Sequence, residues 1–368
     1  MRTSSVKGAQ VQAGRRGTRG TRSRPNREIR DSSIPGLQNQ RNLNAGAPTG
    51  WQRCNIHGMD VAGRQPEADS IELYATISTW MDADIIEANV RNCFENGCSK
   101  VFILDNASMD RTVEVALAAG ATLWETYTTE YYNEDLRIRK QNEIIEKVTK
   151  AEKHKILWWM TLDADEFCAG HNGERVIDTL QKLPEQISTV GSICIDLYPT
   201  PGNPYILGRH PAACFTHGIK RVEGCRMYCS LGHYKHIYFK QTDGLFNVAQ
   251  TRGNHSLATP GKATLLEPDY TLQFFHAPYR RYEETFTRLQ ALCDKNAAGR
   301  HRSMGDDECT GNHGAIKRWR GVQHLYAGEF DKVEMPHSQI YGRQVVGIAV
   351  YPWRVLAPSL AGMFPKSD

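Results

Sequence analysis

The sequence has no apolar run long enough to span a membrane, and its start lacks the apolar segment of a secretory signal. No predicted strand is followed by the G-x-G-x-x-G turn of dinucleotide-binding folds, and no G-x4-G-K-[ST] phosphate loop is present. No internal repeat is recognisable. These absences argue against a membrane-spanning protein, a dinucleotide-dependent enzyme of the Rossmann type and a P-loop enzyme.

Acidic residues are scarce in the first 50 positions, where ten Lys or Arg accompany only Glu28 and Asp31. The whole chain has a formal net charge of +4, so the basic excess belongs to this arm. The arm is also poor in large apolar residues, and it cannot bury enough surface to offset its ordering entropy. We expect residues 1–68 to form a disordered basic arm and, from residue 51, a linker that leads into the fold. Three roles stay open: a solvated tail, a contact with nucleic acid or an anionic surface, or an organelle transit peptide.

The ten cysteines are scattered through predicted elements rather than arranged as a framework. This usage favours free thiols in a reducing compartment, and we expect the protein to be cytoplasmic. One cluster has the residue types that zinc prefers, in the spacing C-x3-C-x3-H-x2-H: Cys225, Cys229, His233 and His236. The same segment also reads as an ordinary strand, so both interpretations stay open.

Residues 71–163 alternate between predicted strands and helices. Strands are expected over 72–79, 101–104, 122–125 and 156–162, and helices over 112–119, 132–150 and the segment between Asp82 and Gly97, with Asp82 as its cap. Such alternation predicts a parallel sheet with helices on its faces, whose ligands bind beyond the carboxyl ends of the strands.

From residue 171 the pattern changes. A helix is expected over 174–183, followed by short strands over 191–198, 214–222, 235–240, 245–250 and 271–276, which predict a mixed or antiparallel arrangement. Pro278 is expected to open a further helix, with Tyr282, Phe286, Leu289 and Leu292 along one side. A last strand is expected over 344–351.

Three carboxylates follow the uncharged strand 156–162, in the order Asp163-Ala164-Asp165-Glu166. Two aspartates so close together can bind one hard divalent cation, because carboxylate oxygens suit Mg²⁺ and Mn²⁺. A polar turn or a helix cap would explain the same residues. Glu166 is consistent with either orienting the turn or facing an acceptor.

Four segments in order resemble those of a family 2 glycosyltransferase. They are Asp82–Ile86 with Val101–Thr112, the D-x-D strand Trp158–Phe167, the turn Gly253-Asn254-His255, and the H-x-P-Y-R segment His276–Phe286. The resemblance covers about residues 70–300. It implies a GT-A fold, in which a Rossmann-like, mostly parallel sheet flanked by helices joins a mixed α/β acceptor half. The domains implied are the arm 1–68, a transferase domain 69–320 divided into a nucleotide-sugar half 69–170 and an acceptor half 171–320, and an extension 321–368 packed on the domain.

The resemblance also implies roles for single residues. Asp163 and Asp165 would bind Mn²⁺ or Mg²⁺, with His276 completing the metal site. Asp105 would contact the base or ribose of a nucleotide-sugar donor, expected to be a UDP-sugar, and Arg280 would clamp its phosphates. Other donor contacts are expected from Asp163 itself and from three residues at the same strand ends: Ser78, Thr79 and Asp110.

The expected reaction is attack by a hydroxyl of a saccharide or other acceptor on the anomeric carbon, with inversion, which needs a general base. Asp243, His255 and Glu223 are the candidates. The turn departs from the family at Ala107, which replaces a glycine and fits only if its backbone stays at negative φ. Two other functions stay open, a metal-dependent nucleotidyltransferase or phosphohydrolase and a nucleic-acid-binding protein led by the arm.

Overall fold

The computed structural model describes residues 52–54, 71–129, 132–152, 156–185, 187–220, 234–241, 249–250, 257–258, 264–266, 272–298, 323–329 and 351–352. The chain divides into Met1–Ala47 and Pro48–Asp368, and all described residues belong to the second unit. Three groups of residues lie outside the described ones: the arm 1–68 apart from residues 52–54, the base candidates Asp243, His255 and Glu223, and the zinc candidates Cys225, Cys229 and His233. The His236 side chain is not described either. The domain boundaries at 68, 170 and 320 stay predictions.

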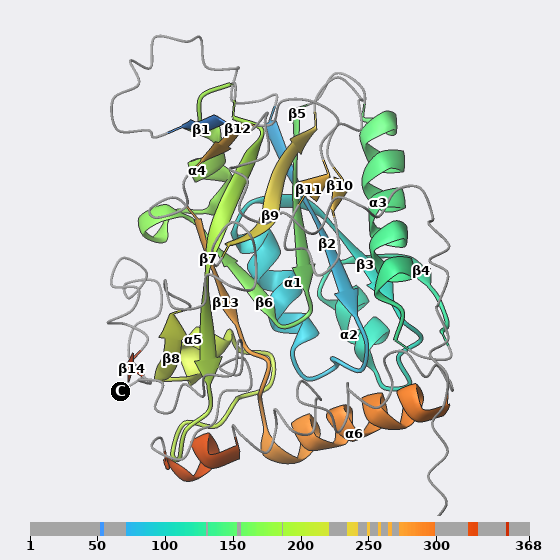
Figure 1. Cartoon of the computed structure of the whole chain (residues 1–368), viewed down its shortest axis with the longest axis vertical. Helices are drawn as coiled ribbons and strands as arrows, with labels where there is room; N and C mark the ends of the chain where they lie inside the picture. Colours follow the sequence, from blue (N-terminus) through green and yellow to red (C-terminus); the bar gives the residue numbers. More distant parts are fainter. Residues whose placement is uncertain are drawn as a thin grey trace, which may run out of the picture. The chain divides into compact units, whose positions relative to one another are not determined.

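A parallel sheet forms the first half, as the alternating pattern predicted. Its order is β5-β2-β3-β4, from strands β2 (Ile71–Thr79), β3 (Cys98–Asp105), β4 (Thr122–Thr126) and β5 (Ile156–Asp163). The connections are helices α1 (Ile86–Glu95), α2 (Thr112–Ala118) and α3 (Glu134–Ala151). The expected α/β class, a mostly parallel central sheet with flanking helices, is confirmed (Figure 1).

Alternate residues of the central strands pack into different cores. Leu73, Ala75 and Ile77 of β2 belong to a buried cluster with side chains of α1 and α2, whereas Tyr74 packs with Ile144 and Ile145 of α3. A strand that buries both faces must be apolar throughout, because successive side chains point to opposite sides. This explains the uncharged run of β5, whose inner six residues are all buried.

The second half joins this sheet through an antiparallel strand. β9 (Tyr234–Gln241) lies between β5 and β7 (Thr189–Tyr198) and is antiparallel to both. β13 (Leu272–His276) runs parallel to β7 and antiparallel to β6 (Glu166–Ala169). The expected mixed arrangement is therefore confirmed. The remaining elements here are α4 (Val176–Gln181), α5 (Pro211–Cys214), β8 (His217–Lys220), β10 (Ala249–Gln250), β11 (Leu257–Ala258), β12 (Thr264–Leu266) and a 3-10 helix over His171–Gly173.

Two segments for which no regular structure or only one strand was predicted contain further strands and a helix. β1 (Gln52–Cys54) pairs with β12, although residues 51–69 read as a linker. Within the expected extension, a 3-10 helix covers Gln323–Ala327, and β14 (Tyr351–Pro352) pairs with β8. The described helices include none that is both long and apolar enough to cross a bilayer.

The two helices with predicted starts at Asp82 and Pro278 begin later than expected. The residue before α1 is Ile85, and no side chain caps this helix; the Asp82 carboxylate instead accepts hydrogen bonds from Thr79 and from the amide of Trp80. α6 (Tyr282–Ala298) starts four positions after Pro278. Of the residues expected along one side of this helix, Tyr282 and Phe286 are 43% and 41% exposed. The expected cap at Asp82 is wrong, because no side chain caps α1 and the Asp82 carboxylate accepts hydrogen bonds from Thr79 and Trp80 instead.

The cysteines agree only in part with the expectation of free thiols. Five described cysteines are free and buried: Cys93, Cys98, Cys168, Cys194 and Cys214. Cys293 of α6 is disulfide-bonded, so the expectation is wrong at this position.

His210 caps the short helix α5 and gives the fold a predictable pH dependence. Its Nδ1 accepts a hydrogen bond from the Ala212 amide at 3.1 Å, and its ring packs against Phe167 and Phe275. Burial lowers the pKa of His210 from 6.5 to about 3. The ring therefore stays neutral in the folded protein and gains its proton on unfolding, so its contribution to stability is present above pH 6.5 and is lost as the pH falls toward about 3.

We expect the free energy of unfolding to fall by about 2 kcal/mol between about pH 8 and about pH 5 because of this group. In His210→Asn an amide oxygen still caps the helix but does not titrate, so this part of the loss should disappear. Urea unfolding of both proteins at the two pH values measures the difference. An equal loss in the variant would show that His210 is not the group responsible.

Candidate functional site

A pocket of about 400 Å³ opens at the edge where β2, β3 and β5 end, and α6 runs along this edge (Figure 1). Its lining comes from four regions: the strand ends, the β2–α1 loop, the start of α3 with the loop before it, and α6 with the end of β13. The lining residues are Ser78, Thr79, Trp80, Asp82, Asn106, Tyr127, Tyr132, Arg137, Asp163, Ala164, Asp165, His276, Arg288, Leu292 and Lys295.

Hydrogen bonds with Asn89 and Glu166 hold the acidic turn after β5 in place. The Asn89 side-chain amide of α1 donates to the carbonyls of Asp163 and Ala164, at 3.1 and 2.8 Å. The Glu166 carboxylate, 1% exposed, accepts the amide N–H of Asp163 at 3.1 Å. Glu166 thus orients the turn. The carboxylates of Asp163 and Asp165 line the pocket above it.

His276 reaches the same turn from the other half of the protein. In the antiparallel pairing of β13 with β6, His276 lies opposite Glu166, and the Ala277 amide donates to the Asp165 carbonyl at 2.9 Å. The His276 Nε2 lies 3.7 Å from an Asp165 oxygen. The strand pairing therefore brings together residues that are far apart in the sequence.

Asp165 and His276 are close enough to bind one divalent cation together. Among the described residues, the three side chains whose ligating atoms all lie within 4.8 Å of one another are Cys194, Asp196 and His276, and this set does not include Asp163. Two atoms that each lie about 2.1 Å from one ion are separated by at most about 4.2 Å, so the separation of His276 Nε2 and the Asp165 oxygen is compatible with a shared ion. Two carboxylates with one imidazole suit Mn²⁺ or Mg²⁺ better than a soft metal. The Asp163 side chain is 36% exposed, so one of the two acids is accessible from the pocket.

Three cationic side chains line the same pocket as these acids. Arg137 of α3 is 7% exposed and pairs with Glu134 at 2.7 Å and with Asp163 at 3.1 Å. Arg288 and Lys295 lie two helical turns apart on α6. Burial lowers the pKa of Lys295, and the charge of Asp105 opposes this change. Cations together with an acidic pair give the pocket groups for both the metal and the oxygens of an anionic ligand.

An aromatic side chain stands beside these cations. The ammonium of Lys295 lies 5.2 Å from the centre of the Trp80 ring and donates to Asn106 at 3.3 Å. Tyr127 and Tyr132 also line the pocket. Aromatic faces of this kind can stack on the ring of a nucleobase.

Asp105 and Asp110 hold the turn after β3 rather than lining the pocket. The Asp105 carboxylate, 1% exposed, accepts from the amide and the hydroxyl of Ser108. Asp110 accepts from the amides of Thr112 and Ala83, and thereby ties this turn to the β2–α1 loop. Asn106, which follows Asp105, is the member of this turn that lines the pocket.

Ala107 adopts φ 53°, so the condition of negative φ, under which alanine would replace the family's glycine without strain, is not met. A side chain in the left-handed region costs about 1 kcal/mol that glycine does not incur. We expect Ala107→Gly to raise the free energy of unfolding by roughly 0.5–1 kcal/mol. Ala118→Gly, at an exposed position of α2, should lower it by a similar amount. Denaturant titration measures both, and a destabilised Ala107→Gly would contradict the strain.

Arg280, the expected phosphate clamp, lies behind the pocket wall. Its side chain is 2% exposed and pairs with Asp82 at 3.1 Å and Asp84 at 2.9 Å. Burial lowers the pKa of Arg280, but the charges of Asp84 and Asp82 outweigh burial and raise it. Arg288 also pairs with Asp82, at 3.3 Å, and it is Arg288 that lines the pocket. In this structure Arg280 thus secures Asp82 rather than facing the pocket.

Of the site residues predicted from the sequence, the pocket brings together Ser78, Thr79, Asp163, Asp165 and His276. It leaves Asp105, Asp110 and Arg280 in supporting positions. Trp80, Asn106, Arg137, Arg288 and Lys295 were missed. A signal existed for the last two: seven residues apart, they lie two helical turns apart on one side of α6.

No family model matches the chain, and no curated protein matches it either. Among solved structures it is similar to glucosyl-3-phosphoglycerate synthase of Mycobacterium tuberculosis, at 17% identity and a TM-score of 0.23, covering 33% of this chain and 44% of that chain. The complex of that enzyme with Mg²⁺ and UDP gives 15% identity and a TM-score of 0.24, covering 39% and 50%. The complex with Mn²⁺, UDP and glucosyl-3-phosphoglycerate gives 16% and 0.24, covering 40% and 52%. The chain spans about half the length of these structures, or less, and the likeness is too weak to carry an argument about activity.

Proposed function

We propose that the protein is a metal-dependent glycosyltransferase that moves a sugar from a nucleoside-diphosphate donor to an acceptor hydroxyl, with inversion at the anomeric carbon. One observation carries the proposal: a single pocket at the strand ends combines an acidic pair, an imidazole, three cationic side chains and aromatic rings. A nucleotide-sugar offers the matching groups, namely a diphosphate, a base and a leaving group that develops negative charge.

In this proposal Asp163, Asp165 and His276 hold Mn²⁺ or Mg²⁺. The bound cation would supply charge stabilisation to the departing diphosphate. Arg288 and Lys295 would bind the diphosphate oxygens.

The remaining groups of the pocket would recognise and orient the donor. Trp80 and Tyr127 offer faces for the base, and a UDP-sugar is the proposed donor. Ser78 and Thr79 lie at the strand end beneath it, and Asp105 and Asp110 act through the turn that carries Asn106. The general base stays a prediction, with Asp243 and His255 as its candidates, and so does a cytoplasmic location.

Binding can be tested by thermal unfolding with UDP, GDP, CDP and dTDP, each with and without Mn²⁺. A ligand at about 100 times its Kd adds about 2.7 kcal/mol of stability, which should raise Tm by about 5 °C or more. The rise should require Mn²⁺ and disappear in Lys295→Ala, whereas Lys182→Ala, on the surface beside α4, should retain it. No shift with any nucleotide and Mn²⁺ would contradict the proposal.

The products separate the alternatives. A glycosyltransferase without an acceptor slowly hydrolyses its donor to a nucleoside diphosphate and free sugar, whereas a phosphohydrolase releases a nucleoside monophosphate and a sugar phosphate. Chromatography of the nucleotide products distinguishes the two. Deleting residues 1–47 should leave turnover unchanged, because the described pocket lies wholly in the second unit; loss of function on deletion would favour a protein that acts through its basic arm.

A further inference from the structure

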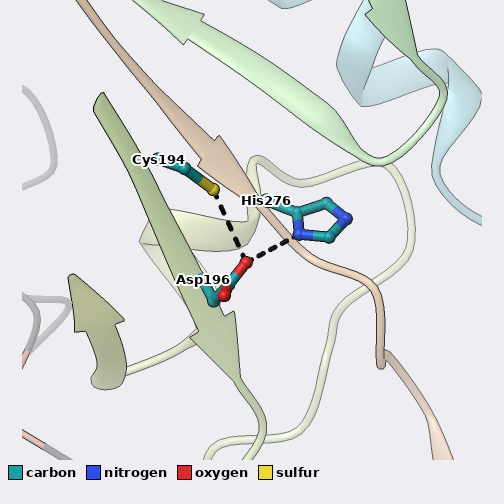
Figure 2. Close-up of side chains that lie close together, drawn as sticks. All are labelled: Cys194, Asp196 and His276. Atoms are coloured by element: carbon teal, nitrogen blue, oxygen red, sulfur yellow. Dashed lines mark hydrogen bonds and ion pairs between the residues drawn. The ribbon is translucent and has the colours of Figure 1, made fainter. Parts of the chain in front are cut away.

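His276 contacts a second acid, Asp196, through the ring nitrogen that faces away from Asp165. Asp196 is buried, and the proposed function gives it no role. Asp196 lies on β7, directly opposite His276 in the parallel pairing with β13. It is 3% exposed, and an Asp196 oxygen lies 2.7 Å from His276 Nδ1 (Figure 2). Cys194, two residues earlier on the same face of β7, places its sulfur 3.5 Å from the same oxygen. A buried carboxylate thus receives donors from two neighbouring strands.

The distance between Asp196 and His276 distinguishes a hydrogen bond from a shared metal ion. The ligating atoms of Cys194, Asp196 and His276 all lie within 4.8 Å of one another, which would also allow a shared metal. However, two ligands about 2.1 Å from one ion at right angles are about 3 Å apart, whereas Asp196 and His276 are at 2.7 Å. The contact therefore has the length of a charge-assisted hydrogen bond, in which Nδ1–H donates to the carboxylate.

A proton on Nδ1 determines the state of the other ring nitrogen. A neutral imidazole carries one proton, so Nε2 then has a free lone pair, and Nε2 is the atom that lies 3.7 Å from Asp165. The opposite tautomer would place the Nδ1 lone pair 2.7 Å from an oxygen of the buried Asp196 carboxylate, which is unfavourable.

We propose that Asp196 is a positioning residue that fixes the tautomer and the orientation of His276, so that Nε2 presents its lone pair to the cation site of Asp163 and Asp165. The benefit to metal binding rests on the proposed function, whereas the orientation of the ring does not. Cys194 adds a weaker S–H donor to the carboxylate and does not touch the acidic turn.

The tautomer can be measured without metal or substrate. We would label histidine with ¹⁵N, record long-range ¹H–¹⁵N correlations at about pH 8, above the ordinary histidine pKa of about 6.5, and assign His276 with the His276→Gln variant. The expected result is a protonated Nδ1 and an unprotonated Nε2. A ring protonated at Nε2, at both nitrogens or on neither would overturn the proposal.

The second measurement is Mn²⁺ affinity, by electron paramagnetic resonance. In Asp196→Asn the amide also offers N–H, which admits the opposite tautomer, so the affinity should fall about 10- to 100-fold and Nε2–H signals should appear. Cys194→Ala on the same strand is the control and should change the affinity less than about threefold. An Asp196→Asn protein with wild-type tautomer and affinity would refute the role.

The two proposals can fail separately. Wild-type protein with Nδ1–H at His276 but no Mn²⁺ binding would contradict the metal-dependent function and still support the action of Asp196 on the ring. Mn²⁺ binding that is lost in Cys194→Ala as well as in Asp196→Asn would instead place the ion at the cluster of Cys194, Asp196 and His276 and overturn the positioning role.

Discussion

Asp165→Asn should lower Mn²⁺-dependent sugar transfer at least about 100-fold and weaken Mn²⁺ binding by a similar factor. The substitution keeps the volume of the side chain but removes the charge that faces both the pocket and the His276 imidazole. A neutral amide is a poor ligand for a hard cation, and the remaining acid, Asp163, already pairs with Arg137.

The matched control is Asp178→Asn. Asp178 lies on α4 and forms an i,i+3 pair with Arg175 on the surface, so turnover and Mn²⁺ affinity should stay within about twofold of wild type. Initial rates with the donor identified by thermal unfolding, together with Mn²⁺ titration, measure both variants. Circular dichroism verifies that Asp165→Asn is folded. Unchanged turnover in this variant would refute the assignment of Asp165 to the metal site.

Asp82→Ala should lower the free energy of unfolding by about 3–5 kcal/mol. The Asp82 carboxylate pairs with Arg280 at 3.1 Å and with Arg288 at 3.3 Å and accepts the hydroxyl of Thr79. Its removal leaves a guanidinium that is 2% exposed with Asp84 as its other acidic partner. A buried charge that loses one of its two acidic partners is costly, because the protein interior replaces its hydration poorly.

Glu284→Ala is the control for Asp82→Ala. Glu284 pairs with Arg281 on the exposed side of α6, where both side chains are more than 40% exposed, and the pair should contribute less than about 1 kcal/mol. Urea unfolding measures both variants. A loss below about 1 kcal/mol in Asp82→Ala would mean that water replaces the carboxylate and that Arg280 is not buried as described.

The sequence was most informative where one physical requirement dictates the residues. A strand buried on both faces must be apolar, so 156–162 could be recognised, and acids directly after such a strand must lie at the sheet edge. This placed Asp163 and Asp165 in the pocket from the sequence alone. His276 could be added only through a resemblance, because nothing in the local pattern of β13 indicates that it pairs with β6.

Long cationic side chains were assigned less well. Arg280 and Arg288 both lie in or near α6 and have identical chemistry, but Arg280 is buried against two acids while Arg288 reaches the pocket. Burial depends on where the Asp82 carboxylate points, and the sequence suggested a helix cap for Asp82. The family resemblance pointed to Arg280, whereas the structure places Arg288 in the lining of the pocket. The positive φ of Ala107 was equally invisible, because alanine rarely adopts it and only the surrounding turn imposes it.

The pairing of β13 with both β6 and β7 limits where residues can be inserted or deleted. His276 faces Asp196 on one neighbour and Glu166 on the other, so the strand register is fixed from two sides. Residues inserted in the connections before and after β7 can be absorbed without disturbing the site, whereas an insertion inside β7 would shift Asp196 away from His276. One residue added or deleted inside β13, between Leu272 and His276, reverses every later side chain and replaces the imidazole by its neighbour. In an alignment of relatives, gaps should therefore accumulate between these strands and be absent within them.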